Sequence, residues 1–565
     1  MLCGVVAARR APHEDGDKTG NTNVRKIQSM LRWGFMWLEG LFDQIFTPRW
    51  NPMYYLGGLG FFYFWIVAVS GLYLYIFFDT GLTEAFTSIE YLTHEQWYLG
   101  GVMRSFHRYA SDALVIMMVL HMVREFAFDH YRGARFFSWI TGVPMTWMVI
   151  AAGVTGYWLV WDELAQYVAI GSAEWLDWLP IFGEPIARNF MSPVSLDDRF
   201  FTLLIFLHIA LPLVLLLVMW IHLQRVAYAK WNPPRGLAAG TMIMMLVLSL
   251  VFPALSHGPA DLARVPQSLN MDWYYLFAFP VIETVGAGPV WGVAFGATFL
   301  LMALPWLPPR KARPAAVVDL ANCNGCTRCA ADCPFNAITM MPRTDDRPFE
   351  QEAVVDADLC VSCGICVGAC PTAMPFRKMS DLVPGIDLPH FSAADLRDRI
   401  HKAAASLEGD DRVMVFGCAH GIHGRKLTGN GRAGIDLPCA AMIPPSFIDY
   451  ILSKDLADGV AVIGCREGEC QYRLGPQWSE DRFEGRRDPH LRARVPRERL
   501  LRIWAAPVTW QSVERQLTAF QNDLGIIPTL STVQRIRRHK GTAAGDDKAI
   551  TATSGDDRPE GEAAS

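Results

Sequence analysis

Long apolar segments limit what this chain can fold into more than any other feature of its sequence. Between about residues 55 and 307, six runs of roughly 20 mostly apolar residues have the length that a helix needs to cross a bilayer. They are Tyr55–Phe78, Ser105–Arg124, Thr141–Val160, Phe200–Gln224, Leu237–Leu255 and Pro289–Leu307. A segment surrounded by lipid must satisfy its backbone hydrogen bonds internally, so we expect an all-α transmembrane bundle with about six spans.

The polar segments around these runs predict where the ends of the chain lie. No cleavable signal peptide is visible, because the first apolar run starts too far into the chain and is too long. Residues 1–29 and the tail 540–565 have the composition of disordered segments. Met30–Phe46 mixes Trp, Phe and Leu with charged residues, which predicts an interfacial helix on the membrane surface.

Lysines and arginines alternate with acidic stretches from one connection to the next. Cytoplasmic loops are enriched in Lys and Arg, so both termini are predicted to be cytoplasmic in an inner-membrane protein. The basic residues that support this orientation are Arg25, Lys26, Arg32, Arg124, Arg132, Arg135, Arg225, Lys230, Arg235, Arg310, Lys311 and Arg313.

Four histidines lie at matching spacing inside two of the apolar runs. His107 and His121 are 14 residues apart, and so are His208 and His222. This is nearly four helical turns, so each pair lies on one helix face, about 21 Å apart. Two such helices facing each other would offer an outer site, His107 with His208, and an inner site, His121 with His222. The alternative is that each histidine is an ordinary hydrogen-bonded core residue.

Haem is the cofactor that these histidines fit. Imidazole is a good axial ligand for haem iron, so the two histidine pairs predict two haems. The sequence has no C-x-x-C-H motif for covalent attachment, which indicates non-covalent haem b. A flat macrocycle packs best on residues without a side chain, and glycines occur with the same 14-residue spacing: Gly57, Gly71, Gly142 and Gly156. Arginines near the histidines are candidates for the haem propionates: Arg104 and Arg108 at the outer site, Arg124 and Arg135 at the inner. The inner arginines are equally explained by membrane topology alone.

Twelve of the thirteen cysteines lie between residues 323 and 470, after the last apolar run. Eight of them form two C-x2-C-x2-C-x3-C-P runs, the signature of a ferredoxin with two 4Fe–4S clusters, in which the fourth cysteine of each run binds the other cluster. The predicted ligand sets are Cys323, Cys326, Cys329 and Cys370 for the first cluster, and Cys360, Cys363, Cys366 and Cys333 for the second. We therefore expect a ferredoxin-like α+β domain at residues 313–380; zinc is the alternative metal.

The remaining cysteines, Cys418, Cys439, Cys465 and Cys470, predict a third site in a small α/β domain at residues 405–535. Apolar runs at Val413–Phe416 and Val460–Ile463 look like strands that end at cysteines, and Pro445–Lys454 and Val508–Leu524 look like helices. Thiolates reserved for iron imply a reducing compartment, which agrees with the cytoplasmic orientation.

The first part of the chain resembles cytochrome b of bc-type complexes, particularly the short form of photosynthetic b/f complexes. The residues responsible are GGVMRSFHRYASDALVIMMVLHMVR and FFSWITGVPMTWMVIAAGVTGYWLVWDELAQYVA. The resemblance implies a haem-binding four-helix core at residues 30–232, two further spans at 233–312, quinone exchange near the haems, and a homodimer.

Two positions depart from that family. Tyr55 stands where the photosynthetic form has a cysteine that fixes an extra haem, so no third haem is expected. Met271-Asp272-Trp273-Tyr274 replaces the family's Pro-Glu-Trp-Tyr motif at the outer quinol site. Asp272, with Tyr274 beside it, could accept a quinol proton, but the reach of Asp272 is one methylene shorter; the alternative is a polar loop residue facing water.

The last domain resembles the delta subunit of methyl-viologen-reducing hydrogenase, through VMVFGCAHG, DLPCAAMI and VIGCREGECQYRLG. That resemblance implies one 2Fe–2S cluster on the last four cysteines and electron exchange with a flavoprotein. Gly421 stands where the family has another cysteine, and His420 or His423 could replace a ligand. Reduced buried thiols without metal are the alternative.

These features predict an electron-transfer subunit rather than an enzyme that transforms an organic substrate. Electrons would pass from a cytoplasmic flavoprotein or dehydrogenase through the 2Fe–2S and 4Fe–4S clusters to the inner haem and the membrane quinone pool. One alternative is quinol oxidation at the outer site, with electrons driven inward by the membrane potential. Another is a redox sensor without sustained flux, and a third is a subunit of a proton-pumping bc complex. No basic block suggests nucleic acid.

Overall fold

The computed structural model describes residues 22–181, 185–187, 198–224, 231–266, 268–307, 313–378, 382–466, 468–506 and 509–526. The chain divides into two compact units, Met1–Lys311 and Ala312–Ser565. Residues 1–21 and the expected disordered tail lie outside the described residues.

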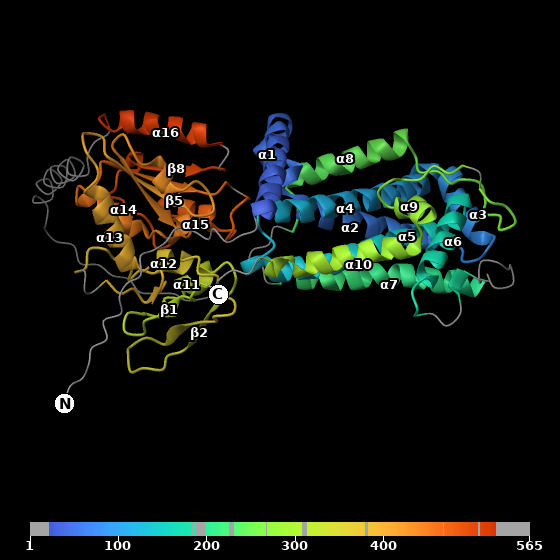
Figure 1. Cartoon of the computed structure of the whole chain (residues 1–565), viewed down its shortest axis with the longest axis horizontal. Coiled ribbons are helices and arrows are strands. Elements are labelled where there is room, and N and C mark those ends of the chain that lie inside the picture. The colour runs from blue at the N-terminus through green and yellow to red at the C-terminus, as the bar shows by residue number, and fades with distance from the viewer. Residues whose placement is uncertain are drawn as a thin grey trace, which may run out of the picture. The chain divides into compact units, whose positions relative to one another are not determined.

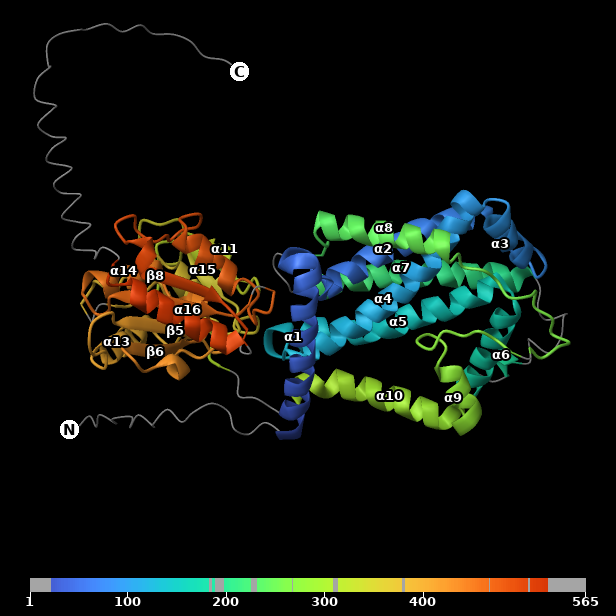
Figure 2. The ribbon, with the colours of Figure 1, turned by 90° about the horizontal axis from the view of Figure 1, so that it is seen from above.

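Long helices running side by side make up the first unit (Figures 1 and 2). They are α2 (Leu56–Phe77), α4 (Val102–Ala127), α5 (Phe136–Val160), α7 (Asp198–Leu223), α8 (Arg235–Val251) and α10 (Ala287–Ala303). Shorter helices occupy the connections: α3 (Glu84–His94), α6 (Glu163–Asp177) and α9 (Ala278–Val285). The histidines of α4 and α7 and the glycines of α2 and α5 therefore all belong to one bundle.

Four of the described helical segments are long and apolar enough to cross a membrane: α2, α5, α7 and Ala287–Trp306, which contains α10. The helix α4 has 26 residues but contains charged side chains, including Arg104, Arg108 and Asp112. The apolar helix α8 has only 17 residues. Six spans therefore stay a prediction for α4 and α8. The large apolar side chains exposed on the helices, such as Phe206, Leu213 and Phe299, are those that lipid would cover.

The helix α1 (Thr22–Trp50) lies across one end of the bundle, roughly perpendicular to the other helices (Figure 2). It begins at Thr22, within the segment expected to be disordered, and includes the whole of Met30–Phe46. Trp33 and Trp37 are exposed, whereas the buried carboxylate of Glu39 accepts hydrogen bonds from Nε (3.0 Å) and an Nη (2.8 Å) of Arg124 on α4. An amphipathic helix pinned in this way has the geometry expected of an interfacial helix.

The second unit begins with two small antiparallel sheets and two short helices. β1 (Val317–Val318) pairs with β4 (Ile386–Asp387), and β2 (Ile338–Pro342) pairs with β3 (Gln351–Val355). The helices α11 (Arg328–Asp332) and α12 (Ile365–Ala369) occupy equivalent places in the two cysteine runs. A ferredoxin-like fold for this region stays a prediction.

A four-stranded parallel sheet forms the rest of the second unit, in the order β6-β5-β7-β8. Its strands are β5 (Val413–Cys418), β6 (Arg432–Leu437), β7 (Gly459–Gly464) and β8 (Leu500–Trp504), and its helices are α13 (Ala393–Ala404), α14 (Pro445–Ser453), α15 (Gly475–Phe483) and α16 (Trp510–Asp523). The predicted strands and helices of this α/β region are confirmed, with β5 ending at Cys418 and β7 followed by Cys465.

The two faces of the parallel sheet pack against different elements. Val413 and Val415 face α16, whereas Met414 and Phe416 face a larger core that includes α13 and α14. This larger core also contains Cys329, Cys366 and Cys370. One hydrophobic core therefore includes residues of both four-cysteine runs and of the parallel sheet, so the second unit holds the two runs rigidly against the sheet.

Candidate functional site

The bundle brings the four histidines together as two pairs. The rings of His107 on α4 and His208 on α7 have centroids 6.3 Å apart at an interplanar angle of 62°. Imidazole nitrogens bind metal ions at about 2 Å, so this separation admits one ion between the two rings. His121 and His222 are also neighbours across α4 and α7, close enough to interact electrostatically. The residues present therefore fit two axial-ligand pairs, as the 14-residue spacing predicted.

Each histidine ring packs against one of the four predicted glycines. A Cβ atom added at Gly71 would lie 2.8 Å from Cε1 of His107, and one at Gly156 would lie 3.1 Å from Cε1 of His208. The corresponding distances are 3.3 Å from Gly57 to His121 and 3.4 Å from Gly142 to His222. The glycines of α2 thus face the histidines of α4, and those of α5 face α7. Their role beside a macrocycle stays a prediction.

Hydroxyl residues that the sequence analysis missed hold three of the four imidazoles. Ser70, Thr141 and Thr155 place their oxygens 3.3, 3.0 and 3.1 Å from Nδ1 of His107, His222 and His208, respectively. The Val67 carbonyl lies 3.0 Å from Nδ1 of His107. Partners at Nδ1 fix the ring orientation and leave Nε2 for a metal.

A sequence signal for these three residues exists, because each stands immediately before one of the glycines that face a histidine. Leu56 occupies that place before Gly57, so the helix α2 offers no hydroxyl there to the ring of His121. His121 faces a carboxylate instead: its Nδ1 lies 4.0 Å from Glu125 Oε1.

All four predicted propionate-binding arginines are paired with acidic residues of the chain. Arg104 lies 3.6 Å from Glu90, Arg124 lies 2.8 Å from Glu39, and Arg135 lies 3.0 Å from Glu125. Arg108 bridges two carboxylates, Asp112 at 3.0 Å and Asp272 at 2.5 Å. Propionate binding by these arginines stays a prediction. It would require each arginine to share its acidic partner with a propionate or to exchange that partner for one.

Asp272 forms an ion pair with Arg108, the residue that follows His107 on α4. Its carboxylate accepts hydrogen bonds from Arg108, from the Tyr157 hydroxyl, and from the Tyr275 backbone N–H at 2.8 Å. Tyr274 interacts with Asp112. A carboxylate offers about four acceptor positions, so three of those on Asp272 are occupied by these donors. The loop residue is therefore directed into the bundle and not into water.

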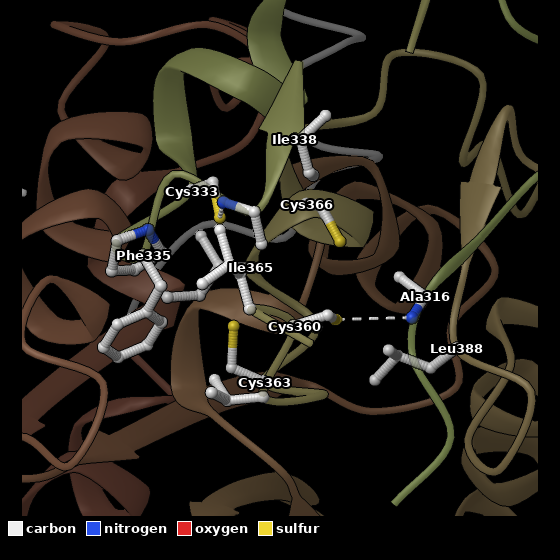
Figure 3. A pocket seen from close by; sticks show the side chains of 14 residues that line it. Ala316, Cys333, Phe335, Ile338, Cys360, Cys363, Ile365, Cys366 and Leu388 are labelled. Carbon is white, nitrogen blue, oxygen red and sulfur yellow. Dashed lines mark hydrogen bonds between the residues drawn. The ribbon is translucent and has the colours of Figure 1, made fainter. Parts of the chain in front are cut away.

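Eight cysteines line two cavities in the second unit. Cys333, Cys360, Cys363 and Cys366 line one, which we call the Cys360 site (Figure 3). Cys323, Cys326, Cys329 and Cys370 line the other, the Cys323 site. The fourth cysteine of each sequence run faces the other run's cavity, in the exchange expected of a two-cluster ferredoxin. Backbone N–H groups of Ala316 and Ala337 donate to the sulfurs of Cys360 (3.4 Å) and Cys333 (3.3 Å).

Burial makes these thiols poor thiolates in the absence of a cation. It raises the pKa of Cys329 and of Cys363 to about 12. Iron binds the thiolate form. The positive iron atoms of a bound cluster would therefore stabilise the thiolates that burial disfavours. In the described ranges, no three His, Cys, Asp or Glu side chains gather closely enough for a single metal ion. Four cysteines line each cavity, which is the number of ligands that one 4Fe–4S cluster takes.

The last four cysteines also converge, as the Cys418 site (Cys418, Cys439, Cys465 and Cys470). The sulfurs of Cys418 and Cys465 are 3.6 Å apart. A Cβ atom added at Gly475 would lie 2.7 Å from the sulfur of Cys439 and 3.1 Å from that of Cys470. All four are at most 4% exposed. This set fits the predicted 2Fe–2S ligands, although ligation stays a prediction.

The two histidines considered as alternative ligands, His420 and His423, have different partners. Nε2 of His420 lies 3.0 Å from the hydroxyl of the buried Tyr472, whereas His423 pairs with Asp436 at 3.2 Å. The Cβ position of Gly421 is 3.7 Å from the sulfur of Cys465. A cysteine there, as in the hydrogenase subunit, would face the same site.

The three cysteine sites are neighbours in a series. Cys363 of the Cys360 site interacts electrostatically with Cys470 and Cys439 of the Cys418 site. On its other side, Cys366 interacts with Cys329 of the Cys323 site. The Cys360 site therefore lies between the other two.

Comparisons with known proteins match each part of the chain to a different family. The models described as Cytochrome b/b6/petB, 4Fe-4S dicluster domain, and Methyl-viologen-reducing hydrogenase, delta subunit, match residues 41–230, 322–374 and 421–526. These matches confirm the three resemblances found in the sequence.

Two individual proteins are also similar to this chain. Cytochrome b6 of Porphyra purpurea is 32% identical over 176 residues, which are 31% of this chain and 81% of the relative. A solved structure titled Hyperthermophilic respiratory Complex III matches at 23% identity with a TM-score of 0.36, over 45% of this chain and 75% of that chain. A cytochrome b domain implies haem b, and a dicluster domain implies 4Fe–4S clusters, so the protein has an electron-transfer role in a membrane as an oxidoreductase subunit. The chain belongs to the cytochrome b family.

Proposed function

We propose that this protein passes electrons from a cytoplasmic redox partner to the membrane quinone pool, as the membrane subunit of a quinone-reducing dehydrogenase complex. The observation on which the proposal depends is the unbroken series of three cysteine sites in a chain that also contains two histidine pairs. Clusters and haems supply single-electron transfer when they are bound. The chain's residues hold these groups, orient them and keep water away.

The order of sites in the second unit supports a path with the Cys418 site first. That site belongs to the domain that resembles a hydrogenase subunit, and a flavoprotein is the donor that this resemblance favours. The Cys360 site lies next to it and the Cys323 site follows. Every one of these cysteines is buried or half-buried, so the groups that they hold are shielded from solvent.

The point where the chain leaves the first unit supports the His121–His222 pair as the site that receives electrons after the cysteine sites. The first unit ends shortly after α10, and the indole N–H of Trp139 donates a 2.7 Å hydrogen bond to the carbonyl of Leu301 near the end of that helix. The neighbouring residue Ser138 donates to the carbonyl of His222 at 3.2 Å. The chain therefore leaves the bundle at the end where this histidine pair lies. We place this end, both termini and the cysteine sites on the cytoplasmic side of an inner membrane, and a homodimer agrees with the family.

Quinol oxidation near the His107–His208 pair is the second candidate function. It is favoured by the position of Asp272, which contacts Arg108 directly beside His107. Against it, three donors already occupy the Asp272 carboxylate. Asp272→Asn tests this alternative. We expect quinone reduction by the pre-reduced protein to change less than about twofold, because the neutral amide keeps a similar shape. Loss of quinol-driven haem reduction in this variant would favour quinol oxidation instead.

Anaerobic reoxidation tests the main proposal. The purified full-length protein is reduced with dithionite, the excess is removed, a soluble quinone is added, and haem and iron–sulfur absorbance are followed together. We expect both to reoxidise on one timescale. Haem reoxidation alone would contradict a connected path, and no response of either would make quinone the wrong acceptor.

A matched variant pair sharpens the result. Cys363→Ala removes a side chain from the middle site, whereas Cys470→Ala removes one from the terminal site. If the order of sites is correct, Cys363→Ala slows reoxidation of the Cys418 site by quinone, and Cys470→Ala leaves reoxidation of the Cys323 site unchanged. Unchanged reoxidation of the Cys418 site in Cys363→Ala, or slower reoxidation of the Cys323 site in Cys470→Ala, would contradict the order.

A further inference from the structure

A buried arginine lies where the segments of two cysteine sites meet. Arg482 on α15 is 1% exposed. Its guanidinium donates hydrogen bonds to the carbonyl of Ala441 at 2.8 Å and to the carbonyl of Ile365 at 3.3 Å, and it forms an ion pair with Asp332. Each partner is one or two residues from a predicted ligand.

The partners of Arg482 come from different sites. Ile365 and Asp332 directly precede Cys366 and Cys333, which both belong to the Cys360 site. Ala441 follows Cys439 of the Cys418 site by two residues, and the guanidinium is close enough to Cys439 to interact with it electrostatically. Arg482 is thus fastened to both sites at once.

The glycine Gly368 makes this approach possible. A Cβ atom added there would lie 2.6 Å from an Nη of Arg482 and 2.0 Å from the carbonyl oxygen of Ala441. Gly368 lies on α12 between Cys366 and Cys370. Because it has no side chain, Arg482 and the loop that follows Cys439 can pack closely against α12 at this position.

The charge of Arg482 is only partly neutralised within the protein. Asp332, 2% exposed, is its carboxylate partner, but Asp332 also pairs with Arg487 at 2.5 Å. These three residues together have one excess positive charge. In addition, Nε of Arg482 is buried and meets no acceptor among the described residues. A buried N–H without an acceptor and a buried excess cation both point to a negatively charged group beside them.

We propose that Arg482 is a positioning residue that raises the reduction potentials of the iron–sulfur groups at the Cys360 and Cys418 sites together. Reduction adds one electron to a group whose thiolate ligands already make it negative. A fixed cation at low dielectric stabilises that added charge more than it stabilises the oxidised form. No bond forms or breaks in this step, and the electron comes from the redox partner of the proposed function. The inference rests on the proposed function in taking clusters to occupy these cysteines and in naming that partner.

Redox titration of the full-length protein, monitored by electron paramagnetic resonance, tests the inference. The iron and sulfide contents are measured first. In Arg482→Gln we expect the ratio of reduced to oxidised group at a fixed potential to fall about tenfold at the Cys360 and Cys418 sites, which is 59 mV for one electron. We expect a smaller change at the Cys323 site. Arg482→Lys keeps the charge and should stay within about threefold of the wild type.

Arg487→Gln is the matched control, because Arg487 shares Asp332 but its side chain is 24% exposed and solvent screens its charge. It should shift both ratios less than Arg482→Gln does. Unchanged ratios in loaded Arg482→Gln protein, or a shift as large in Arg487→Gln, would overturn the inference.

If Arg482→Gln does not assemble clusters, Asp332→Asn decides the matter. It leaves the arginine charge uncompensated, so both ratios should rise; a fall or no change would overturn the proposal. A wild-type protein that binds no iron or sulfide would overturn the proposed cluster function as well, whereas loaded protein without these shifts would overturn only the role of Arg482.

Discussion

The two histidine pairs of the bundle are built on one plan but differ in one member. At the His107–His208 pair, each ring has a hydroxyl and a glycine beside it, Ser70 with Gly71 and Thr155 with Gly156. At the His121–His222 pair, only His222 has this arrangement. His121 faces the carboxylate of Glu125 instead. The 14-residue repeat therefore sets the positions of the predicted ligands, whereas the residues behind the rings distinguish the two pairs chemically.

The surroundings of Glu125 extend this difference. Its second oxygen lies 3.2 Å from Nδ1 of His130 and 3.0 Å from Arg135. Near the other pair, the charged cluster is formed by Arg108, Asp112 and Asp272, and its ion pairs join these three residues to one another. A carboxylate beside an axial imidazole makes that ligand more basic, so we expect the haem at the His121–His222 pair to have the lower potential that this single contact favours.

Loss of one histidine from each pair should have the largest effect. We expect His107→Ala and His121→Ala each to lower b-type haem content by about half, because each removes one axial ligand from one pair only. Pyridine haemochrome analysis of purified protein measures this. His257→Ala is the control, since His257 pairs with Asp162 and belongs to neither pair. Full haem content in either variant would contradict the assignment of that histidine as a haem ligand.

Glycine substitutions should separate the pairs next. Gly71→Ala places a methyl 2.8 Å from Cε1 of His107, whose ring is held by the Val67 carbonyl, whereas Gly57→Ala meets His121 at 3.3 Å. Overpacking costs about 1–3 kcal/mol, and we expect Gly71→Ala to lie at the upper end and Gly57→Ala at the lower. Haem retention during urea titration compares them. Gly240→Ala, with open space around its Cβ position, serves as control; a larger loss in Gly57→Ala would contradict the prediction.

Much of the site was predictable from the sequence because its periodicities are strict. The 14-residue histidine and glycine spacings follow from helix geometry, and the two C-x2-C-x2-C-x3-C-P runs specify their own exchange of ligands. The strands ending at Cys418 and before Cys465 followed from continuous apolar runs, which are typical of strands buried on both faces. In each case a short-range rule fixed the positions of the side chains.

Contacts between distant segments were not predictable in this way. The ion pairs of Arg104 with Glu90 and of Arg108 with Asp272 join residues 14 and 164 positions apart. Arg482 meets Asp332 across 150 positions. No local periodicity encodes such a partner. The helix α1 begins eight residues before the predicted helix, and Gln28 in this added part donates a 2.9 Å hydrogen bond to the carbonyl of Phe126 on α4.

Neutralising Glu125 should have a moderate effect on one pair only. In Glu125→Gln, we expect the haem at the His121–His222 pair to become easier to reduce, because an amide withdraws the negative charge near His121. Optical redox titration measures both haems in the same sample, so the His107–His208 pair is the internal control. Equal movement of both haems, or movement to lower potential, would contradict the assignment of Glu125 to one pair.

Removal of a hydroxyl behind a histidine should have the smallest effect. Thr155→Val deletes an oxygen 3.1 Å from Nδ1 of His208, and one such hydrogen bond contributes about 1 kcal/mol. The ring keeps a backbone partner, the carbonyl of Ala152, so haem should still bind but be lost at lower urea concentration. Thr146→Val is the matched control, since Thr146 lies on the same helix and contacts the carbonyl of Gly142. If the two valine variants lose haem at the same urea concentration, the hydroxyl does not hold the ring, and the plan shared by three of the four histidines reduces to the glycines alone.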